Sequence, residues 1–200
     1  MPLNVLLLGP QGAGKGTQAK RISAEYGIPH VASGEILRAE MQAGTDLGRR
    51  VKDVYDRGDL VSDDLMIELI RTRLEQPDTE SGFVLDGFPR TMPQAEALSD
   101  VLRELGRELD VVFDLQVPDR EVLMKRMLRR AAEEGRSDDT PEAMQRRLEL
   151  YDRETAPLVD YYRSHQANVV GVHADRSPDE VFREIDDALA ETQRHRKVEA

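Results

Sequence analysis

The residues best suited to chemistry in this sequence form a glycine-rich run near its start. Gly9–Thr17 reads GPQGAGKGT, directly after the apolar run Asn4–Leu8 and at the start of a segment with helical patterning, Lys15–Tyr26. Glycines let backbone N–H groups turn inward around phosphate oxygens, the lysine adds positive charge, and a helix N-terminus favours anions. This strand–loop–helix context predicts a binding site for a nucleoside triphosphate.

Two side chains in or near this loop carry oxygen atoms that could bind Mg²⁺ directly or through water. Gly16 follows Lys15, so the hydroxyl of the loop comes one position later than usual, at Thr17. This displacement predicts that Mg²⁺ is held mainly through water. Asp86 follows the apolar run Gly82–Leu85, and a carboxylate at the tip of a neighbouring parallel strand is well placed to hold Mg²⁺ or its waters. A helix cap or a surface turn is the alternative for Asp86.

The elements that must position these residues alternate along the chain. Short runs that are apolar on both faces predict the buried strands Asn4–Leu8, Pro29–Ala32, Gly82–Leu85, Val111–Val117 and Val169–Val172. Longer amphipathic stretches predict the helices Lys15–Tyr26, Ser62–Gln76, Pro93–Gly106, Arg120–Glu134, Pro141–Ser164 with a bend or break at Pro157, and a last helix from Pro178, with a polar tail at Arg194–Ala200. This alternation is typical of an α/β fold around a parallel sheet.

Two segments interrupt the alternation. Residues 33–61 contain two short helices split near Gly44, where one crossover helix would suffice, and residues 131–140 form a short polar stretch between two long helices. Insertions at the strand ends of an open α/β sheet are where ligands bind. On shape alone, each segment could equally be an ordinary connection.

Composition and charge exclude several classes of protein. The chain has 200 residues, of which 39% are hydrophobic, and this suits one domain with a substantial core. A net charge of −11 argues against a protein that coats nucleic acid or an anionic membrane. The longest early apolar run, Val5–Leu8, is too short for a membrane span or a signal peptide, so we expect a soluble intracellular protein. With no cysteine there are no thiolate metal sites, and the four histidines lack metal-ligand spacing, so we interpret them as surface or packing residues.

Motifs along the whole chain resemble those of the adenylate kinases. They are the loop at 9–17 with its displaced Thr, SGEILR at 33–38, DLV at 59–61, DGFPR at 86–90 with Gln94, and GRSDD at 135–139 followed by Arg147. They occur in the order found in that family. The resemblance implies reversible phosphoryl transfer from Mg·ATP to AMP, giving two ADP, and a role in adenine nucleotide homeostasis.

The resemblance also implies an architecture. This is a P-loop NTPase-type five-stranded parallel sheet flanked by helices, with a helical AMP-binding insertion and a short lid. The core would comprise residues 1–32, 62–129 and 141–200, the insertion residues 33–61 and the lid residues 130–140. The lid lacks the zinc-binding cysteines that some members carry, so we expect Mg²⁺ with ATP and no zinc. We further expect a cytoplasmic monomer without nucleic-acid or membrane partners.

Carried over to matching positions, the resemblance assigns the site residues. The ATP-binding set is Gly12, Ala13, Gly14, Lys15, Gly16, Thr17, Arg130 and the backbone of Arg176. The AMP-binding set is Ser33, Arg38, the backbone of Asp59, Leu60 and Val61, then Gly87, Phe88, Pro89, Arg90 and Gln94, with Arg136 and Arg147 bridging both nucleotides. The catalytic set is Lys15, Arg90, Arg130, Arg136 and Arg147, and Asp86 would hold Mg²⁺ through water. Asp138 and Asp139 would accept from Arg136 or from arginines at the hinge, or form a solvated turn.

These assignments make physical sense for transfer between two nucleotides. The acceptor phosphate of AMP is already an anion, so the protein must align two polyanions and neutralise charge, without a general base. Six positive side chains would surround that line: Lys15, Arg38, Arg90, Arg130, Arg136 and Arg147. Closure of both insertions would keep water from competing as the acceptor.

Two other functions remain open from the sequence. The first is a UMP/CMP kinase with the same core, against which Gln94 argues, because a carboxamide can both donate to and accept from an adenine edge. The second is a P-loop regulator that uses a nucleotide as a conformational switch. Two anion-binding regions with their own arginines argue against that second function, since a switch needs only one nucleotide.

Overall fold

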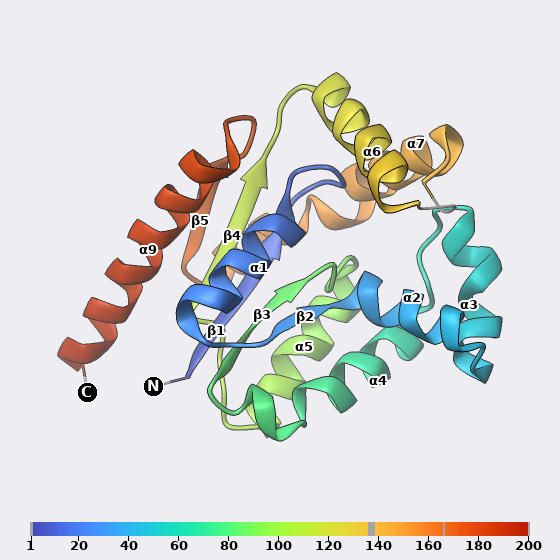
Figure 1. Ribbon diagram of the computed structural model, residues 1–200. Helices are drawn as coiled ribbons and strands as arrows, with labels where there is room; N and C mark the ends of the chain where they lie inside the picture. Colours follow the sequence, from blue (N-terminus) through green and yellow to red (C-terminus); the bar gives the residue numbers. More distant parts are fainter. Residues whose placement is uncertain (1, 136–138, 166, 200) are drawn as a thin grey trace.

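A computed structural model describes residues 2–135, 139–165 and 167–199 of the chain. Across these residues, five strands form one parallel sheet in the order β2-β3-β1-β4-β5 (Figure 1). The strands are β1 (Leu3–Leu8), β2 (His30–Ala32), β3 (Gly82–Asp86), β4 (Val111–Gln116) and β5 (Val169–His173). The predicted fold class and the positions of all five predicted strands are confirmed, but in β5, which was expected to be buried, only Val172 is buried.

The helices also follow the predicted order. They are α1 (Lys15–Tyr26), α2 (Ser33–Ala43), α3 (Asp46–Asp56), α4 (Asp63–Leu74), α5 (Met92–Glu104), α6 (Arg120–Glu134), α7 (Pro141–Leu150), α8 (Leu158–Ser164) and α9 (Pro178–Glu199). A short 3₁₀ turn, η1 (Pro77–Thr79), precedes β3. In this part of the chain, no helix combines the length and the apolar character that a membrane span requires.

One helix prediction is confirmed and one needs correction. The helix expected over 141–164 with a bend or break at Pro157 is divided there into α7, a π-helical turn η2 (Tyr151–Thr155) and α8. Pro157 lacks an N–H and cannot continue the α-helical ladder, and the chain widens before it, so that the Ala156 N–H donates to the Tyr151 carbonyl at 2.8 Å. At the end of the chain, the expected polar tail instead continues α9 as far as Glu199.

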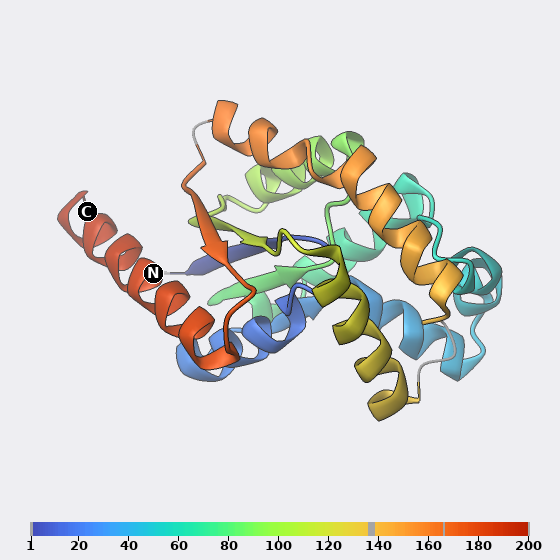
Figure 2. The ribbon, with the colours of Figure 1, turned by 90° about the horizontal axis from the view of Figure 1, so that it is seen from above.

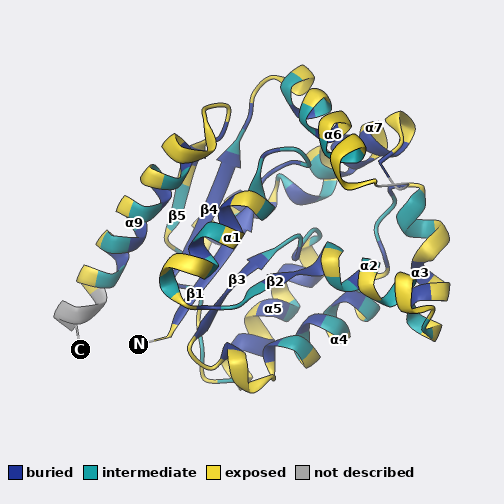
Figure 3. Cartoon of the chain, viewed as in Figure 1, coloured by how far each residue is buried: buried dark blue, intermediate teal, exposed yellow. Residues whose placement is uncertain are grey.

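Strand β1 divides the hydrophobic core into two layers. Leu3, Val5 and Leu7 belong to one buried cluster with apolar side chains of α1, α6 and α9, whereas Leu6 and Leu8 belong to a second cluster with those of α4, α5 and α8. Helices therefore cover both faces of the sheet (Figures 1 and 2). Figure 3 shows the buried strands β1, β3 and β4 at the centre and exposed positions on the outer helix faces. Burial on both faces explains why these central strands lack apolar–polar alternation.

The topology determines where a ligand can bind. β1 pairs with β3 on one side and with β4 on the other, so the strand order reverses at the loop that follows β1. In open α/β sheets, ligands bind at such a point beyond the carboxyl ends of the strands. The segment α2–α3 follows β2, and α6 follows β4, so both interrupting segments extend from this same edge (Figure 1).

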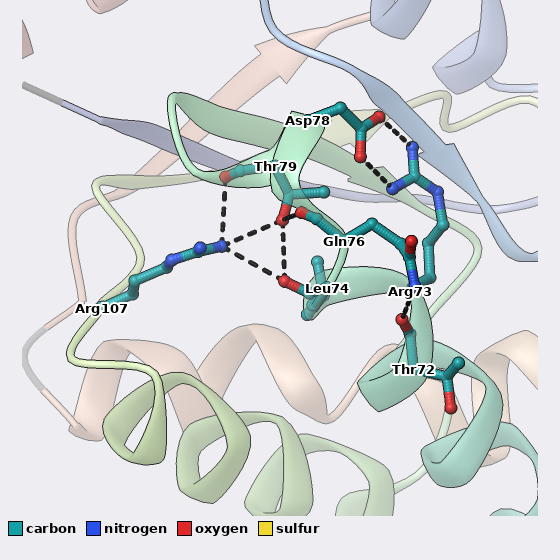
Figure 4. Close-up of polar contacts among 7 residues, drawn as sticks. All are labelled: Thr72, Arg73, Leu74, Gln76, Asp78, Thr79 and Arg107. Atoms are coloured by element: carbon teal, nitrogen blue, oxygen red, sulfur yellow. Dashed lines mark hydrogen bonds and ion pairs between the residues drawn. The ribbon is translucent and has the colours of Figure 1, made fainter.

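A polar cluster at the opposite edge fixes the start of β3 (Figure 4). Arg107 donates from one nitrogen to the carbonyl of Thr79 at 3.1 Å and to that of Leu74 at 3.4 Å. The fully buried Thr79 hydroxyl also donates to the Leu74 carbonyl at 2.7 Å, and Arg73 binds both carboxylate oxygens of Asp78. The two bonds to Leu74 satisfy the last carbonyl of α4, which a helix leaves without a partner of its own.

The packing of the core predicts that replacing a buried leucine lowers the free energy of unfolding far more than replacing an exposed one. Leu98 in α5 is 1% exposed and Leu128 in α6 is 48% exposed. Leu98→Ala should lower the free energy of unfolding by about 2–5 kcal/mol, because it removes buried methyl groups and leaves a cavity. The matched control Leu128→Ala should change it by less than about 0.5 kcal/mol. Urea denaturation of both variants measures the difference, and equal effects would contradict this packing.

Candidate active site

A cleft of about 590 Å³ opens at the carboxyl ends of the strands. Its walls come from the loop after β1, from α2 and the end of α3, from the loop after β3, and from α6, α7 and the start of α9. Most of the predicted site residues line it: Gly12, Ala13, Gly14, Lys15, Gly16, Thr17, Arg38, Asp59, Leu60, Asp86, Gly87, Pro89, Arg90, Arg130, Arg147 and Arg176. The fold thus brings together residues from distant parts of the chain.

Other predicted residues lie behind this wall or outside the described part of the chain. Ser33, Val61, Phe88 and Gln94 are buried and do not line the cleft. Val61 and Phe88 pack in the core with α4 and α5. Ser33 supports the turn after β3, because a Cβ on Gly87, which has φ 82°, would lie 2.6 Å from the Ser33 hydroxyl oxygen. Arg136, like Asp138, lies outside the described residues.

The phosphate loop is shaped by close backbone approaches. A Cβ on Gly12, which has φ 84°, would lie 2.8 Å from the Leu123 carbonyl oxygen. Gly14 is the N-cap of α1 in the left-handed conformation, and no side chain caps the helix there. The first N–H groups of α1 therefore face the cleft without a side-chain cap, as an anion-binding helix start requires.

Lys15 is held inside this loop by neutral acceptors. Its ammonium donates to the carbonyls of Gly9 at 2.7 Å and Pro10 at 3.0 Å. Burial lowers the pKa of Lys15 to about 8, and the positive charges of Arg90 and Arg130 act in the same direction, while Asp86 opposes them. A bound phosphate chain would supply the negative charge that keeps Lys15 protonated.

Asp86 and Thr17 provide oxygen atoms that fit a Mg²⁺ site. The Asp86 carboxylate lies against the loop, 3.6 Å from where a Cβ on Gly16 would be. Burial opposes its charge, but the neighbouring His30 ring and the Lys15 ammonium hold the pKa of Asp86 below its ordinary value. Thr17 is exposed to the cleft. Mg²⁺ binds one or two carboxylates and completes its shell with water and substrate phosphates, so this donor set fits.

Arg90 is fixed by three neighbours. Its guanidinium Nε donates to the Gly87 carbonyl at 2.7 Å. Its backbone N–H donates to Gln94 Oε1 at 2.8 Å, and its backbone carbonyl accepts from the Thr155 hydroxyl at 2.8 Å. Burial lowers the pKa of Arg90, and the charge of Arg147 adds to this effect. The guanidinium therefore lies near other cations, and the negative charge of Asp86 opposes their effect on its pKa.

Gln94 is already bonded at both ends of its carboxamide. Besides accepting from Arg90, it donates from Nε2 to Asp63 Oδ1 at 2.8 Å, and it is 2% exposed. In this arrangement Gln94 supports the Arg90 backbone, and contact with a base would require these bonds to exchange. Base recognition by Gln94 stays a prediction.

Arg130 in α6 and Arg147 in α7 meet at one carboxylate. Asp139, whose side chain is fully buried, accepts from Arg130 Nε at 3.0 Å and also binds the guanidinium of Arg147. Of the alternatives open from the sequence, acceptance from hinge arginines is therefore confirmed for Asp139. Arg129 instead lies 3.7 Å from Glu133 in an exposed ion pair.

Sequence reasoning missed four residues of this region. Tyr55 and Thr155 line the cleft, and Arg126 donates to the Ala174 carbonyl at 2.8 Å beside the phosphate loop. His30, which we expected to be a surface or packing residue, has Nε2 3.6 Å from Asp86 Oδ2. The turn around Pro157 was a usable signal for Thr155, but no motif or spacing pointed to the other three.

Comparison with known proteins agrees with this geometry. The sequence model of the family described as "Adenylate kinase" matches residues 7–167. The chain belongs to the adenylate kinase family. Relatives named "Adenylate kinase" include one from Stenotrophomonas maltophilia (strain K279a), 48% identical over 85% of this chain and 91% of the relative. Others come from Leptospira biflexa serovar Patoc (strain Patoc 1 / Ames), 51% identical over 80% and 86%, and Methanosarcina barkeri (strain Fusaro / DSM 804), 41% identical over 92% and 96%.

The environment of Lys15 predicts that ATP binding depends on pH. With a pKa of about 8, Lys15 is protonated below that pH and loses its charge above it. ATP affinity should therefore be constant below about pH 8 and fall above it, by up to about tenfold per pH unit. Isothermal titration calorimetry from about pH 7 to 10 measures this.

Lys15→Arg is the matched control, because a guanidinium with a pKa above about 12 stays charged across this range. It should bind ATP more weakly, with an affinity that does not change with pH. The same decline in both proteins would show that another group titrates.

Proposed function

We propose that this cleft is where the enzyme transfers a phosphoryl group from ATP to AMP, giving two ADP. The observation that carries the proposal is that one cleft is lined by five predicted cations from separate elements, here called the cationic set: Lys15, Arg38, Arg90, Arg130 and Arg147. A single nucleotide needs fewer arginines at its phosphates than this set provides. Two phosphate chains placed end to end account for all five.

The ATP side of the proposal uses the phosphate loop. The N–H groups of Gly12–Thr17 would surround the phosphates, with Lys15 at the transferred group and Arg130 facing it from α6. Asp86 through water, together with Thr17, would hold Mg²⁺, which supplies neutralisation of phosphate charge when it is bound. The backbone at Arg176 would meet the base, while the Arg176 side chain turns toward Glu184.

The AMP side uses the opposite wall. Arg38 and Arg90 would bind the AMP phosphate, the turn Gly87–Pro89 and the backbone of residues 59–61 would enclose the nucleoside, and Arg147 would lie between the two phosphate chains. Arg136 is proposed to join Arg147 there. The AMP phosphate attacks as an anion, so positioning and charge stabilisation are the contributions asked of these residues.

Closure would complete the site. We assign residues 33–61 to an insertion that closes on AMP and residues 130–140 to a lid that closes on ATP, around the core formed by 1–32, 62–129 and 141–200. Closure excludes water, which would otherwise accept the phosphoryl group. We propose a cytoplasmic monomer, because one chain supplies both walls of the cleft.

Product analysis with three acceptors tests the proposal. The protein is mixed with Mg·ATP and AMP, UMP or CMP, and nucleoside diphosphates are separated by chromatography. AMP should be the preferred acceptor, with two ADP formed for each ATP consumed. Preference for UMP or CMP would favour the pyrimidine kinase, and ATP hydrolysis without acceptor phosphorylation would contradict phosphoryl transfer to a nucleotide.

Lys15→Met checks the proposed chemistry in the same assay. The variant removes a charge that faces oxygens gaining negative charge in the transition state, so turnover should fall by about 100-fold or more with the fold intact. Circular dichroism establishes the fold. A loss below about tenfold, equivalent to about 1.4 kcal/mol, would contradict the role of Lys15.

A further inference from the structure

We infer that Tyr55, to which no sequence motif pointed, positions the two arginines Arg38 and Arg147 for the AMP side of the reaction. The inference rests on the proposed function, since Tyr55 acts only through these arginines. Tyr55 is a positioning residue, and it takes no part in the chemical step.

The first contact joins two helices of the segment 33–61. Arg38 in α2 donates from Nη1 to the hydroxyl of Tyr55 near the end of α3, at 2.7 Å. Gly34, one turn before Arg38, leaves room for this pair: a Cβ there would lie 3.3 Å from Arg38 Nη1 and 3.7 Å from the Tyr55 hydroxyl oxygen. The bond therefore fixes the direction of the Arg38 guanidinium on the wall of the cleft.

The second contact joins the same residue to α7. The guanidinium carbon of Arg147 lies 5.5 Å from the centre of the Tyr55 ring, within the range of cation–π attraction. Arg147 also donates from Nη2 to the Tyr55 backbone carbonyl at 3.3 Å. Tyr55 thus touches two members of the cationic set that come from different helices, α2 and α7.

Tyr55 itself contacts both guanidinium groups only through uncharged acceptors, and the negative charge beside Arg147 comes from Asp139 instead. A phenol hydroxyl, a peptide carbonyl and an aromatic face are uncharged acceptors, whereas a carboxylate at the same place would cancel charge that a phosphate requires. A guanidinium has five N–H donors, and the bond from Arg38 to Tyr55 uses one of them. The orientation of Arg38 is therefore set while most of its donors stay available for an anion.

Steady-state kinetics of three variants test this role. Tyr55→Phe removes only the hydroxyl, so the AMP KM should rise about three- to tenfold while kcat and the ATP KM stay within about twofold. Tyr55→Leu also removes the ring and should lower kcat in addition, because Arg147 loses its aromatic contact. The control Tyr161→Phe, in α8 and outside the cleft lining, should match the wild type.

A double-mutant cycle separates positioning from a general structural effect. If Tyr55 acts through Arg38, then Tyr55→Phe should change the AMP KM by less than about twofold in an Arg38→Met background. Full additivity of the two changes would overturn the inference, as would an unchanged AMP KM in Tyr55→Phe alone.

Gly34→Ala tests the same pair with both residues in place. The added Cβ crowds Arg38 against Tyr55, and the AMP KM should rise while the ATP KM does not. If Tyr55→Phe does not fold, an unchanged AMP KM in Gly34→Ala overturns the inference. Failure of the proposed function is a different result, namely a wild-type protein that makes no ADP from ATP and AMP.

Discussion

Positive side chains are held close together in this protein, and neutral acceptors hold three of them, Lys15, Arg38 and Arg90, without cancelling their charge. Like charges repel strongly where water is excluded. Lys15 donates hydrogen bonds to two backbone carbonyls, Arg90 donates to the carbonyl of Gly87, and Arg38 donates to the hydroxyl of Tyr55. These neutral acceptors orient the cations and leave their charge in place. The burial of Lys15 and Arg90 lowers the pKa of both groups. A bound polyanion would raise both pKa values again, because it stabilises the charged forms.

The parallel sheet makes this arrangement possible. It places the phosphate loop after β1 beside Asp86 at the end of β3, and rigid strands buried on both faces fix that distance. Three of the arginines, Arg38, Arg130 and Arg147, come instead from the helices α2, α6 and α7, whereas Arg90 lies in the loop that follows β3. Asp139 binds Arg130 and Arg147 together.

Features set by local sequence were predictable, and features set by distant contacts were not. The phosphate loop and the strand ends follow from glycine spacing and apolar runs, and they match the structure. The contact of Arg147 with Tyr55 joins residues 92 positions apart, and Gln94 meets Asp63 across 31 positions, so no local pattern reveals either. Pro157 signalled a break in its helix, but its local effect, the π turn that delivers Thr155 to the Arg90 carbonyl, depends on how the chain packs.

The central claim is that the cationic set serves two phosphate chains at once. A ligand in which five phosphates join two adenosines would span both proposed sites, and calorimetry compares its affinity with those of ATP and AMP. We predict that the joined ligand binds at least about 100-fold more tightly than ATP, because its second half binds at high effective concentration once the first half is bound. Equal affinities for the joined ligand and for ATP would contradict two adjoining sites.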